Sequence, residues 1–544
     1  MAMRRTFAFV LIAMGALAPS GAGAQATGSV PTQYITKLYT EALGRAPDQA
    51  SWPAVVSSFA GGCTVESLKR LGVSFYTSGE YTSLGYSNEA RLITLYRGAL
   101  SREPDSAGFA SWKRELDGGA PWATVVEGVF SSREFAASVG RTCNASYGWS
   151  TTPVLDVPTD GAVGFGGGSG AALQSLLDER AAAGGGVVFL RKRAVVRATA
   201  TLTIPGGVTL MTEGNPGPRQ YAEMGRIVRA SGFNAPLVSI SSRGALEHVW
   251  IDGRRSEIGY IVPPTGIRDA AGYNVLALCD VTLSETRIGD AAGWTNVYVA
   301  GASYPAAGCA SDTTHATIAG NLITGYASPD TSYTQDGISA AFQNTRIATN
   351  TLVDLTDVHM VLFRAEAGKT QRSQITGNTV FSGGNAAGGG IVLDPLPAPT
   401  PADRVHYSFA GTLVEDNTIW TSSRGYIKVA LSVGTRPWFG DYANYADGAT
   451  VQRNGTGSSA LVTNANILIA AAGMSDPTVV EGNAFYGTPF ARPPGVDPRV
   501  CPVAGTAMDA DSAYAPASVQ GGSFVRVHFP ADGCVPPFAW PPPW

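Results

Sequence analysis

The chain has 544 residues, of which 44% are hydrophobic and 15% are charged. This composition excludes a disordered protein and is sufficient for two or more domains. The formal net charge of −4 supplies no basic surface, so we expect no nucleic-acid partner.

The N-terminus has the features of an export signal. Arg4 and Arg5 precede an apolar run at 7–18, and Ala22 and Ala24 form a small-residue cleavage site before residue 25. Residues 1–24 are therefore predicted to be a signal peptide of a bacterial protein that is secreted, periplasmic or on the cell surface. The run is short for a membrane span, so we expect no membrane insertion, and a retained anchor is the alternative.

Cysteines in an exported chain favour disulfides, and six of them allow 15 pairings. Pairing in chain order keeps each bridge inside one predicted domain. No two cysteines have the CxxC-type spacing that zinc prefers, so no metal site is expected. The expected bridges are Cys63–Cys143, Cys279–Cys309 and Cys501–Cys534.

Residues 31–145 contain a duplication at helical spacing. The phrase at 34–48 (YITKLYTEALGRAPD) returns at 91–105 (RLITLYRGALSREPD), and each copy closes on a phrase of aromatics, Ser and Glu. Apolar residues at this spacing before a Pro-Asp turn predict helices that end there. The Arg and Asp of each phrase are expected to form a salt-bridged turn.

This LGRxPD…W…SxEF phrase resembles a domain of unknown function that is common in secreted bacterial proteins and is similar to phycobilisome-linker domains. The resemblance covers about 110 residues. It implies an accessory helical module without a catalytic site, used for attachment to a cell surface or matrix, or for secretion.

Residues 146–159 are rich in Pro, Ser and Thr and are predicted to be a linker. A short helical stretch, a triple glycine at 184–186 and the strand VVFL at 187–190 follow. A helix here would cover the open end of a solenoid. This opening resembles that of pectate-lyase-like right-handed parallel β-helices, whose members more often than not act on polysaccharides.

A strand–Asn–strand theme then repeats along the chain. It places Asn321, Asn350 and Asn378 at steps of 350−321 = 29 and 378−350 = 28 residues, and it returns at Asn417 and Asn483. A fixed period predicts a mainly β fold, a right-handed parallel β-helix over 160–490, preceded by an all-α domain. Ordinary β-hairpins with Asn turns are the alternative. Residues 491–544 are predicted to be a Pro-rich, disulfide-tied tail.

The phrases at 335–342 (QDGISAAF) and 356–363 (TDVHMVLF) superimpose with an offset of 21 residues, about one coil. This places Asp336 over Asp357, about 5 Å apart, which is one strand spacing. Like charges at that distance raise one pKa, so the pair is a candidate acid and base.

Two further residues are expected to support this catalytic pair. His359 lies two residues after Asp357, so strand alternation puts both on one face. Arg364 follows the strand, where it is placed to bind an acidic sugar's carboxylate. The alternative is that the aspartates cap turns and that His359 is a satisfied partner.

Asp354, Asp394, Trp420 and Trp438 are the candidate substrate-binding residues, although packing is the alternative for each tryptophan. No cofactor is expected, and calcium remains open. We therefore predict an exported glycoside hydrolase or polysaccharide lyase with a polysaccharide partner. The Asn-Thr-Asp, double-Asp, Gly-His-Gly and Arg-Ile-Lys set of polygalacturonases is absent. The alternative is a non-catalytic surface or matrix protein that binds carbohydrate or serves as a scaffold.

Overall fold

The computed structural model describes residues 30–144, 148–263, 270–301, 315–325, 334–364, 370–439, 442–459, 461–463, 465–469 and 478–489, and two strands at 506–509 and 524–527. The predicted signal peptide (1–24) lies outside the described residues. So do Cys309, Cys501 and Cys534, and with them two of the expected disulfides.

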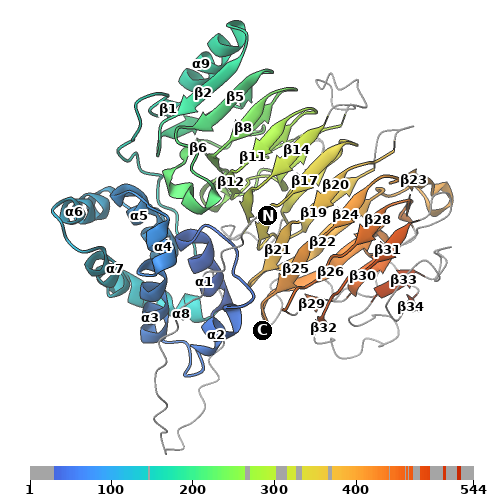
Figure 1. Ribbon diagram of the computed structural model, residues 1–544, viewed down its shortest axis with the longest axis horizontal. Coiled ribbons are helices and arrows are strands. Elements are labelled where there is room, and N and C mark those ends of the chain that lie inside the picture. Colours follow the sequence, from blue (N-terminus) through green and yellow to red (C-terminus); the bar gives the residue numbers. More distant parts are fainter. Residues whose placement is uncertain are drawn as a thin grey trace, which may run out of the picture.

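The N-terminal repeat is helical, as predicted (Figure 1). Its α-helices are α1 (Thr32–Lys37), α2 (Trp52–Ser57), α3 (Val65–Tyr76), α4 (Gly79–Ser83), α5 (Asn88–Leu95), α6 (Ser106–Asp117), α7 (Trp122–Phe130) and α8 (Arg133–Cys143), with π-helical turns η1 (Leu38–Ala42) and η2 (Tyr96–Leu100). Polar residues begin several of them: the side chains of Ser78, Ser87, Asp105 and Ser132 each accept a backbone N–H of the first turn.

The two copies of the repeated phrase form the same salt-bridged turn. Arg45 donates to both oxygens of Glu80 at 2.7 and 2.9 Å, and Arg102 does the same to Glu134 at 2.5 and 2.8 Å. Each arginine also contacts the Asp three residues later at 3.1 Å. The expectation of a salt-bridged turn is confirmed for both copies.

A disulfide joins Cys63 to Cys143, with the two Cα atoms 5.6 Å apart, so this predicted bridge is confirmed. It ties the segment before α3 to the end of α8. Cys279 is also disulfide-bonded.

The rest of the chain is a right-handed parallel β-helix whose coils add one strand in turn to each of three parallel sheets. Sheet 1 contains β2 (Gly186–Leu190), β5 (Val208–Thr212), β8 (Ala245–Glu247), β11 (Thr282–Ser284), β14 (Ala316–Ala319), β17 (Thr345–Ala348), β20 (Gln374–Thr376), β24 (Leu413–Glu415), β28 (Thr450–Gln452) and β31 (Val479–Glu481). Sheet 2 contains β1 (Gly168–Ser169), β3 (Val195–Ala198), β6 (Gly225–Arg229), β9 (Val249–Asp252), β12 (Arg287–Gly289), β15 (Leu322–Thr324), β18 (Thr351–Val353), β21 (Thr379–Ser382) and β25 (Thr418–Thr421).

Sheet 3 contains β4 (Leu202–Ile204), β7 (Val238–Ile240), β10 (Val275–Ala277), β13 (Thr295–Val299), β16 (Asp336–Ala340), β19 (Val358–Phe363), β22 (Ala386–Asp394), β26 (Tyr426–Val433), β30 (Ala465–Ile469), β33 (Thr506–Asp509) and β34 (Phe524–Val527). The last two strands belong to the segment expected to be a tail. They pair in parallel with β30 and with each other, so this part of the tail continues sheet 3. Proline-rich surroundings conceal such four-residue strands in the sequence.

Smaller elements decorate the solenoid. Two strand pairs, β23 (His406–Ser408) with β27 (Tyr445–Asp447) and β29 (Leu461–Thr463) with β32 (Gly487–Pro489), lie outside the three sheets. Short helices are η3 (Pro218–Glu223), α10 (Arg255–Ile258), η5 (Pro401–Asp403) and α11 (Arg436–Phe439). Helix α9 (Gly170–Ala182) covers the first coil, and its Leu173 and Leu177 join the solenoid core.

A ladder of buried asparagines runs along one corner, as the sequence period predicted. The side-chain N–H of Asn321 donates to the amide oxygen of Asn350 at 2.9 Å, and Asn350 donates likewise to Asn378 at 3.0 Å. The ladder continues through Asn417, Asn454 and Asn483. Each amide therefore satisfies the next coil and holds its register.

The helical part packs along the outer face of sheet 2 (Figure 1). Trp52 of α2 contacts the rings of Phe381 and Trp420 edge-on, with centroids 5.4 and 5.7 Å apart. At the far end Gln49 donates to the Thr456 carbonyl. The helices thus span coils from β6 to beyond β25, and the two parts share a buried interface.

A buried charge network joins the two parts near the first coils. Glu41 of η1 is fully buried and accepts hydrogen bonds from Arg97 at 2.7 Å, Arg287 of β12 at 2.5 Å and Tyr221 of η3 at 2.6 Å. Burial alone would raise the pKa of Glu41, but Arg287 and Arg97 hold it well below its usual range. The carboxylate is therefore ionised in the folded protein.

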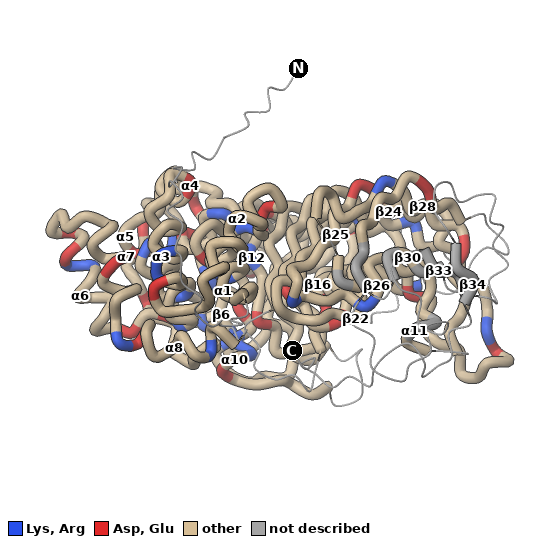
Figure 2. The backbone as a smooth tube through the Cα atoms, turned by 90° about the horizontal axis from the view of Figure 1, so that it is seen from below, with Lys and Arg blue, Asp and Glu red and all other residues tan. Residues whose placement is uncertain are grey.

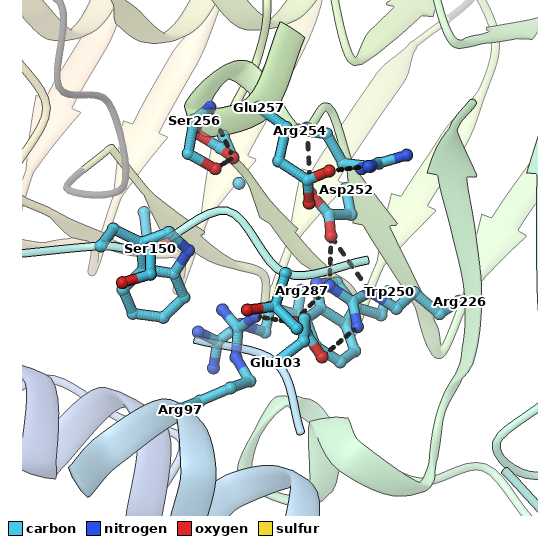
Figure 3. A pocket seen from close by; sticks show the side chains of 15 residues that line it. Arg97, Glu103, Ser150, Arg226, Trp250, Asp252, Arg254, Ser256, Glu257 and Arg287 are labelled. Carbon is cyan, nitrogen blue, oxygen red and sulfur yellow. Dashed lines mark hydrogen bonds and ion pairs between the residues drawn. The ribbon is translucent and has the colours of Figure 1, made fainter. Parts of the chain in front are cut away.

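A second group of charges continues this network (Figure 3). Arg226 pairs with Glu103 of the helical part and with Asp252 of β9, and its guanidinium lies 3.6 Å from the centre of the Trp250 ring. The adjoining cavity measures about 20 Å³, which suffices for a water molecule and not for a sugar. The charges at this interface therefore hold the helical part and the β-helix together.

Charges elsewhere do not form a basic stripe. Figure 2 shows Lys and Arg interspersed with Asp and Glu along the helical part, while much of the β-helix is uncharged. Within the described ranges, none of the helices combines the length and the apolar character that crossing a bilayer requires.

Replacing Glu41 by Gln should lower the free energy of unfolding by about 3–5 kcal/mol, because Arg97 and Arg287 would keep uncompensated buried charges. Glu134→Gln is the matched control. Glu134 also pairs with an arginine but is 48% exposed, so its loss should cost less than about 1 kcal/mol. Urea unfolding of both variants checks this, and equal costs would contradict the structural role of Glu41.

Candidate functional site

The two candidate catalytic aspartates lie on neighbouring coils of sheet 3, but their predicted register is wrong by one residue. Ile338 of β16 pairs with Met360 of β19, which places Asp336 beside Val358, a 22-residue offset. The alignment of Phe342 on Phe363 was misleading. Phe342 belongs to the solenoid core, whereas Phe363 packs in an outer cluster with Val361 and Trp438.

Asp336 begins β16 and is 5% exposed. One carboxyl oxygen accepts the Val358 N–H at 2.9 Å, and the other accepts the Ser339 hydroxyl at 2.9 Å. Burial raises the pKa of Asp336 well above its usual value, and the neighbouring Asp357 and Asp394 carboxylates raise it further. Asp336 is therefore protonated more readily than an exposed aspartate.

Asp357 directly precedes β19 and is less buried than Asp336. Its carboxylate accepts the Thr334 hydroxyl at 2.8 Å. Burial raises the pKa of Asp357, whereas Thr334 and the positive charge of Lys428 lower it. The pair therefore has the property expected of a coupled acid and base, although the two carboxyls differ in their surroundings.

His359 does not lie on the face of the acid pair, so this part of the prediction is wrong. Its register partner Gly337 faces Leu352 and Leu355 of the core, and register partners in parallel strands share a face. The imidazole is 0% exposed, and its Nδ1 lies 3.1 Å from the Gly389 carbonyl. Because Asp357 precedes the strand, strand alternation does not extend from it to His359.

Arg364 and Asp394 lie together at the other end of these strands. Arg364 follows β19, hydrogen-bonds to the Tyr407 hydroxyl and stacks 4.7 Å from the centre of that ring. Asp394 ends β22 and accepts the Leu396 N–H at 2.6 Å. Burial raises the pKa of Asp394 to about 7, and Arg364 partly opposes this shift.

Two of the candidate substrate-binding residues, Asp354 and Trp420, are buried and stabilise the fold. Asp354 is fully buried, and one oxygen accepts the backbone N–H groups of 383, 384 and 385, so it stabilises a turn. Trp420 is 1% exposed beneath the helical part. Trp438 of α11 does lie at sheet 3, next to Val361 and Val392.

Lys428 is a site residue that the sequence analysis missed. It lies in β26, is 4% exposed, and has its Nζ 5.1 Å from the centre of the Trp438 ring. A single lysine within the apolar strand Tyr426–Val433 is the signal that would have identified it. Trp294, Tyr298 and Phe363 add aromatic contacts nearby.

The arrangement contains the groups that acid–base chemistry uses. Within the part of the chain that the structure describes, no group of three His, Cys, Asp or Glu is placed to hold a metal ion. Two carboxyls with raised pKa values lie beside a lysine, and an arginine–tyrosine pair lies at the far end of the strands.

A comparison with protein families confirms a domain of unknown function in part of the helical repeat, and it does not show the expected similarity to phycobilisome-linker domains. The family model "Domain of unknown function (DUF4214)" matches residues 72–139. No curated protein matches the sequence.

Several solved structures are similar in part. The mannuronan C-5 epimerase A-module of Azotobacter vinelandii is 15% identical, with 69% of this chain and 98% of that chain covered and a TM-score of 0.36. A tailspike protein of E. coli bacteriophage HK620 is 13% identical, with 64% and 62% covered and a TM-score of 0.32. A surface adhesin of Streptococcus pneumoniae is 13% identical, with 60% and 88% covered and a TM-score of 0.28. These likenesses carry no argument about activity.

The buried His359 should make stability depend on pH. Burial lowers its pKa to about 4 from 6.5, so the folded protein keeps it neutral while the unfolded chain protonates it. Its contribution is complete above about pH 6.5 and is lost as the pH falls towards 4, by up to about 3 kcal/mol.

Urea unfolding at pH 7 and pH 4.5 checks this effect. His359→Asn should remove much of the loss between the two values, whereas the exposed His315→Asn should retain it. An unchanged pH dependence in His359→Asn would show that His359 does not titrate as its burial requires.

Proposed function

We propose that the protein is an exported polysaccharide-active enzyme whose reaction takes place on the outer face of sheet 3. The observation that carries this proposal is the placement of the carboxyls of Asp336 and Asp357 on adjacent coils of sheet 3, where the Asp357 carboxylate raises the pKa of the buried Asp336. General acid–base catalysis uses pairs of titratable groups whose different surroundings set their pKa values apart.

Each carboxyl has a distinct role in this proposal. Asp357 is the less buried of the two and meets the substrate first, whereas Asp336, on the adjacent coil, is 5% exposed. One carboxyl then removes a proton, from water in a hydrolase or from the sugar ring in a lyase, while the other donates a proton to the departing glycosidic oxygen. Both a glycoside hydrolase and a polysaccharide lyase use such a pair.

The surroundings of the pair fit a carbohydrate. The Trp294 ring packs edge-to-face with Tyr298 and Phe363 near the strands, and aromatic rings pack well on the apolar side of a sugar. Arg364, held by Tyr407, supplies a cation for an acidic sugar's carboxylate. Asp394 and Trp438 complete the proposed binding face.

The second candidate is a non-catalytic carbohydrate-binding or structural protein of the surface or matrix. One observation favours it: Asp336 accepts the Val358 N–H and the Ser339 hydroxyl, as structural carboxyls do. In both cases the helical part has one side against sheet 2. Attachment to a surface or matrix would then use its opposite side, around α6 to α8.

Asp357→Asn should lower turnover of the substrate polysaccharide by about 10²–10⁴-fold, because a general acid or base contributes that much. Asp336→Asn should also lower turnover. The measurement is the release of reducing ends or unsaturated sugars from a panel of neutral and acidic bacterial polysaccharides, and melting temperatures establish that the variants are folded.

Asp403→Asn provides the matched control, since this aspartate is exposed and bonds only locally to Thr400 among the described contacts. It should leave turnover unchanged. Binding without turnover by the wild-type protein would favour the non-catalytic candidate. Full turnover by both aspartate variants would exclude the proposed catalytic pair.

A further inference from the structure

Asp357, Gly388 and Lys428 lie in register across three neighbouring coils of sheet 3. Val358 pairs with Gly389, and Gly389 pairs with Val429. The residues directly before these three are Asp357, Gly388 and Lys428, so they form one row. The Gly388 N–H donates to the Asp357 carbonyl at 2.8 Å, which fixes the first step of this row.

The middle residue of the row, Gly388, has no side chain, and side-chain atoms of Asp357 and Trp438 occupy the space next to its Cα atom. A Cβ atom at Gly388 would lie 3.1 Å from Oδ1 of Asp357 and 3.4 Å from Nε1 of Trp438. The backbones of Asp357 and Lys428 are two strand spacings apart, about 10 Å. Glycine therefore lets the long Lys428 side chain act on the Asp357 carboxylate without an intervening side chain.

The groups around the two carboxyls differ in sign. Asp357 is faced by the Asp336 carboxyl from β16, by the Thr334 hydroxyl, and by the charge of Lys428 from β26. Asp336 is faced by the Val358 N–H, the Ser339 hydroxyl and the charges of Asp357 and Asp394. Among the described groups that act on the pair, the cation is on the side of Asp357.

We propose that Lys428, acting across Gly388, is the positioning residue that keeps Asp357 ionised beside a protonated Asp336. This assignment rests on the proposed function and deepens it. Asp357 is then the base of the pair and accepts the proton that the reaction removes, while Asp336 is the acid and gives up its own. The direction of proton flow in the site follows from which coil carries the lysine.

The test is the pH titration of the two carboxyls in the full-length protein labelled with ¹³C at the aspartate Cγ. Signals are assigned by their loss in Asp336→Asn and Asp357→Asn. In the wild-type protein Asp357 should titrate at a lower pH than Asp336. In Lys428→Met the midpoint of Asp357 should rise by about one pH unit or more, because an opposite charge has been removed.

A control separates charge from structure. Lys428→Arg should return the Asp357 midpoint to near its wild-type value. An Asp357 midpoint that does not move in Lys428→Met would overturn the proposal. If that variant does not fold, the order of the two midpoints in the wild-type protein decides, and Asp336 titrating below Asp357 would overturn it.

Turnover measured on the same variants keeps this proposal distinct from the enzymatic one. A midpoint that shifts as expected in a protein without turnover on any polysaccharide supports the role of Lys428 and counts against the enzyme. A loss of turnover in Asp357→Asn supports the enzyme. If the Asp357 midpoint nevertheless stays unchanged in Lys428→Met, the role of Lys428 is rejected.

Discussion

The register between coils is the constraint on which the rest of this structure depends. Parallel strands stack at a spacing of about 4.8 Å, so one residue of register decides which side chains meet. Here the register is held by backbone ladders and by the asparagine amides, each of which bonds to the amide of the next coil. Inward residues such as Ile338 and Met360 pack in the same order.

The same constraint explains how the site is built. On the outer face of a sheet, residues from successive coils line up in rows. Groups of different charge in neighbouring positions can then act on one another. Asp336, Asp357 and Lys428 come from three separate coils, and the glycine between the last two leaves their interaction open. The pair acquires raised pKa values because its face is largely buried, while the lysine provides the difference between its members.

The helical part takes part in this architecture and is not a flexible appendage. Its Glu41 binds arginines of both parts, and its Trp52 covers Trp420 of sheet 2. A buried ion pair is costly to break, because each partner left behind is an uncompensated charge. Sheet 2 is therefore committed to intramolecular packing, whereas the candidate site lies on sheet 3.

The sequence by itself determined the repeating elements of this protein. The solenoid was predicted from the regular spacing of Asn321, Asn350 and Asn378, because such a period can be read directly from the sequence. The helical repeat was predicted in the same way from the two Arg-Asp phrases. The Cys63–Cys143 bridge followed from its position within one domain. Asp336 and Asp357 were found as neighbours on adjacent coils, yet their register was wrong, because a matching Phe does not reveal whether it faces inward.

Only the tertiary structure decided which face each side chain occupies and what covers it. His359 is fully buried in register with Gly337, which faces core leucines, and Trp420 is covered by a helix more than 350 residues earlier in the chain. Lys428 shares a row with Asp357 across Gly388, although the two residues are 428−357 = 71 positions apart. Such relations depend on the packing of whole coils and domains, and local residue patterns carry no record of them.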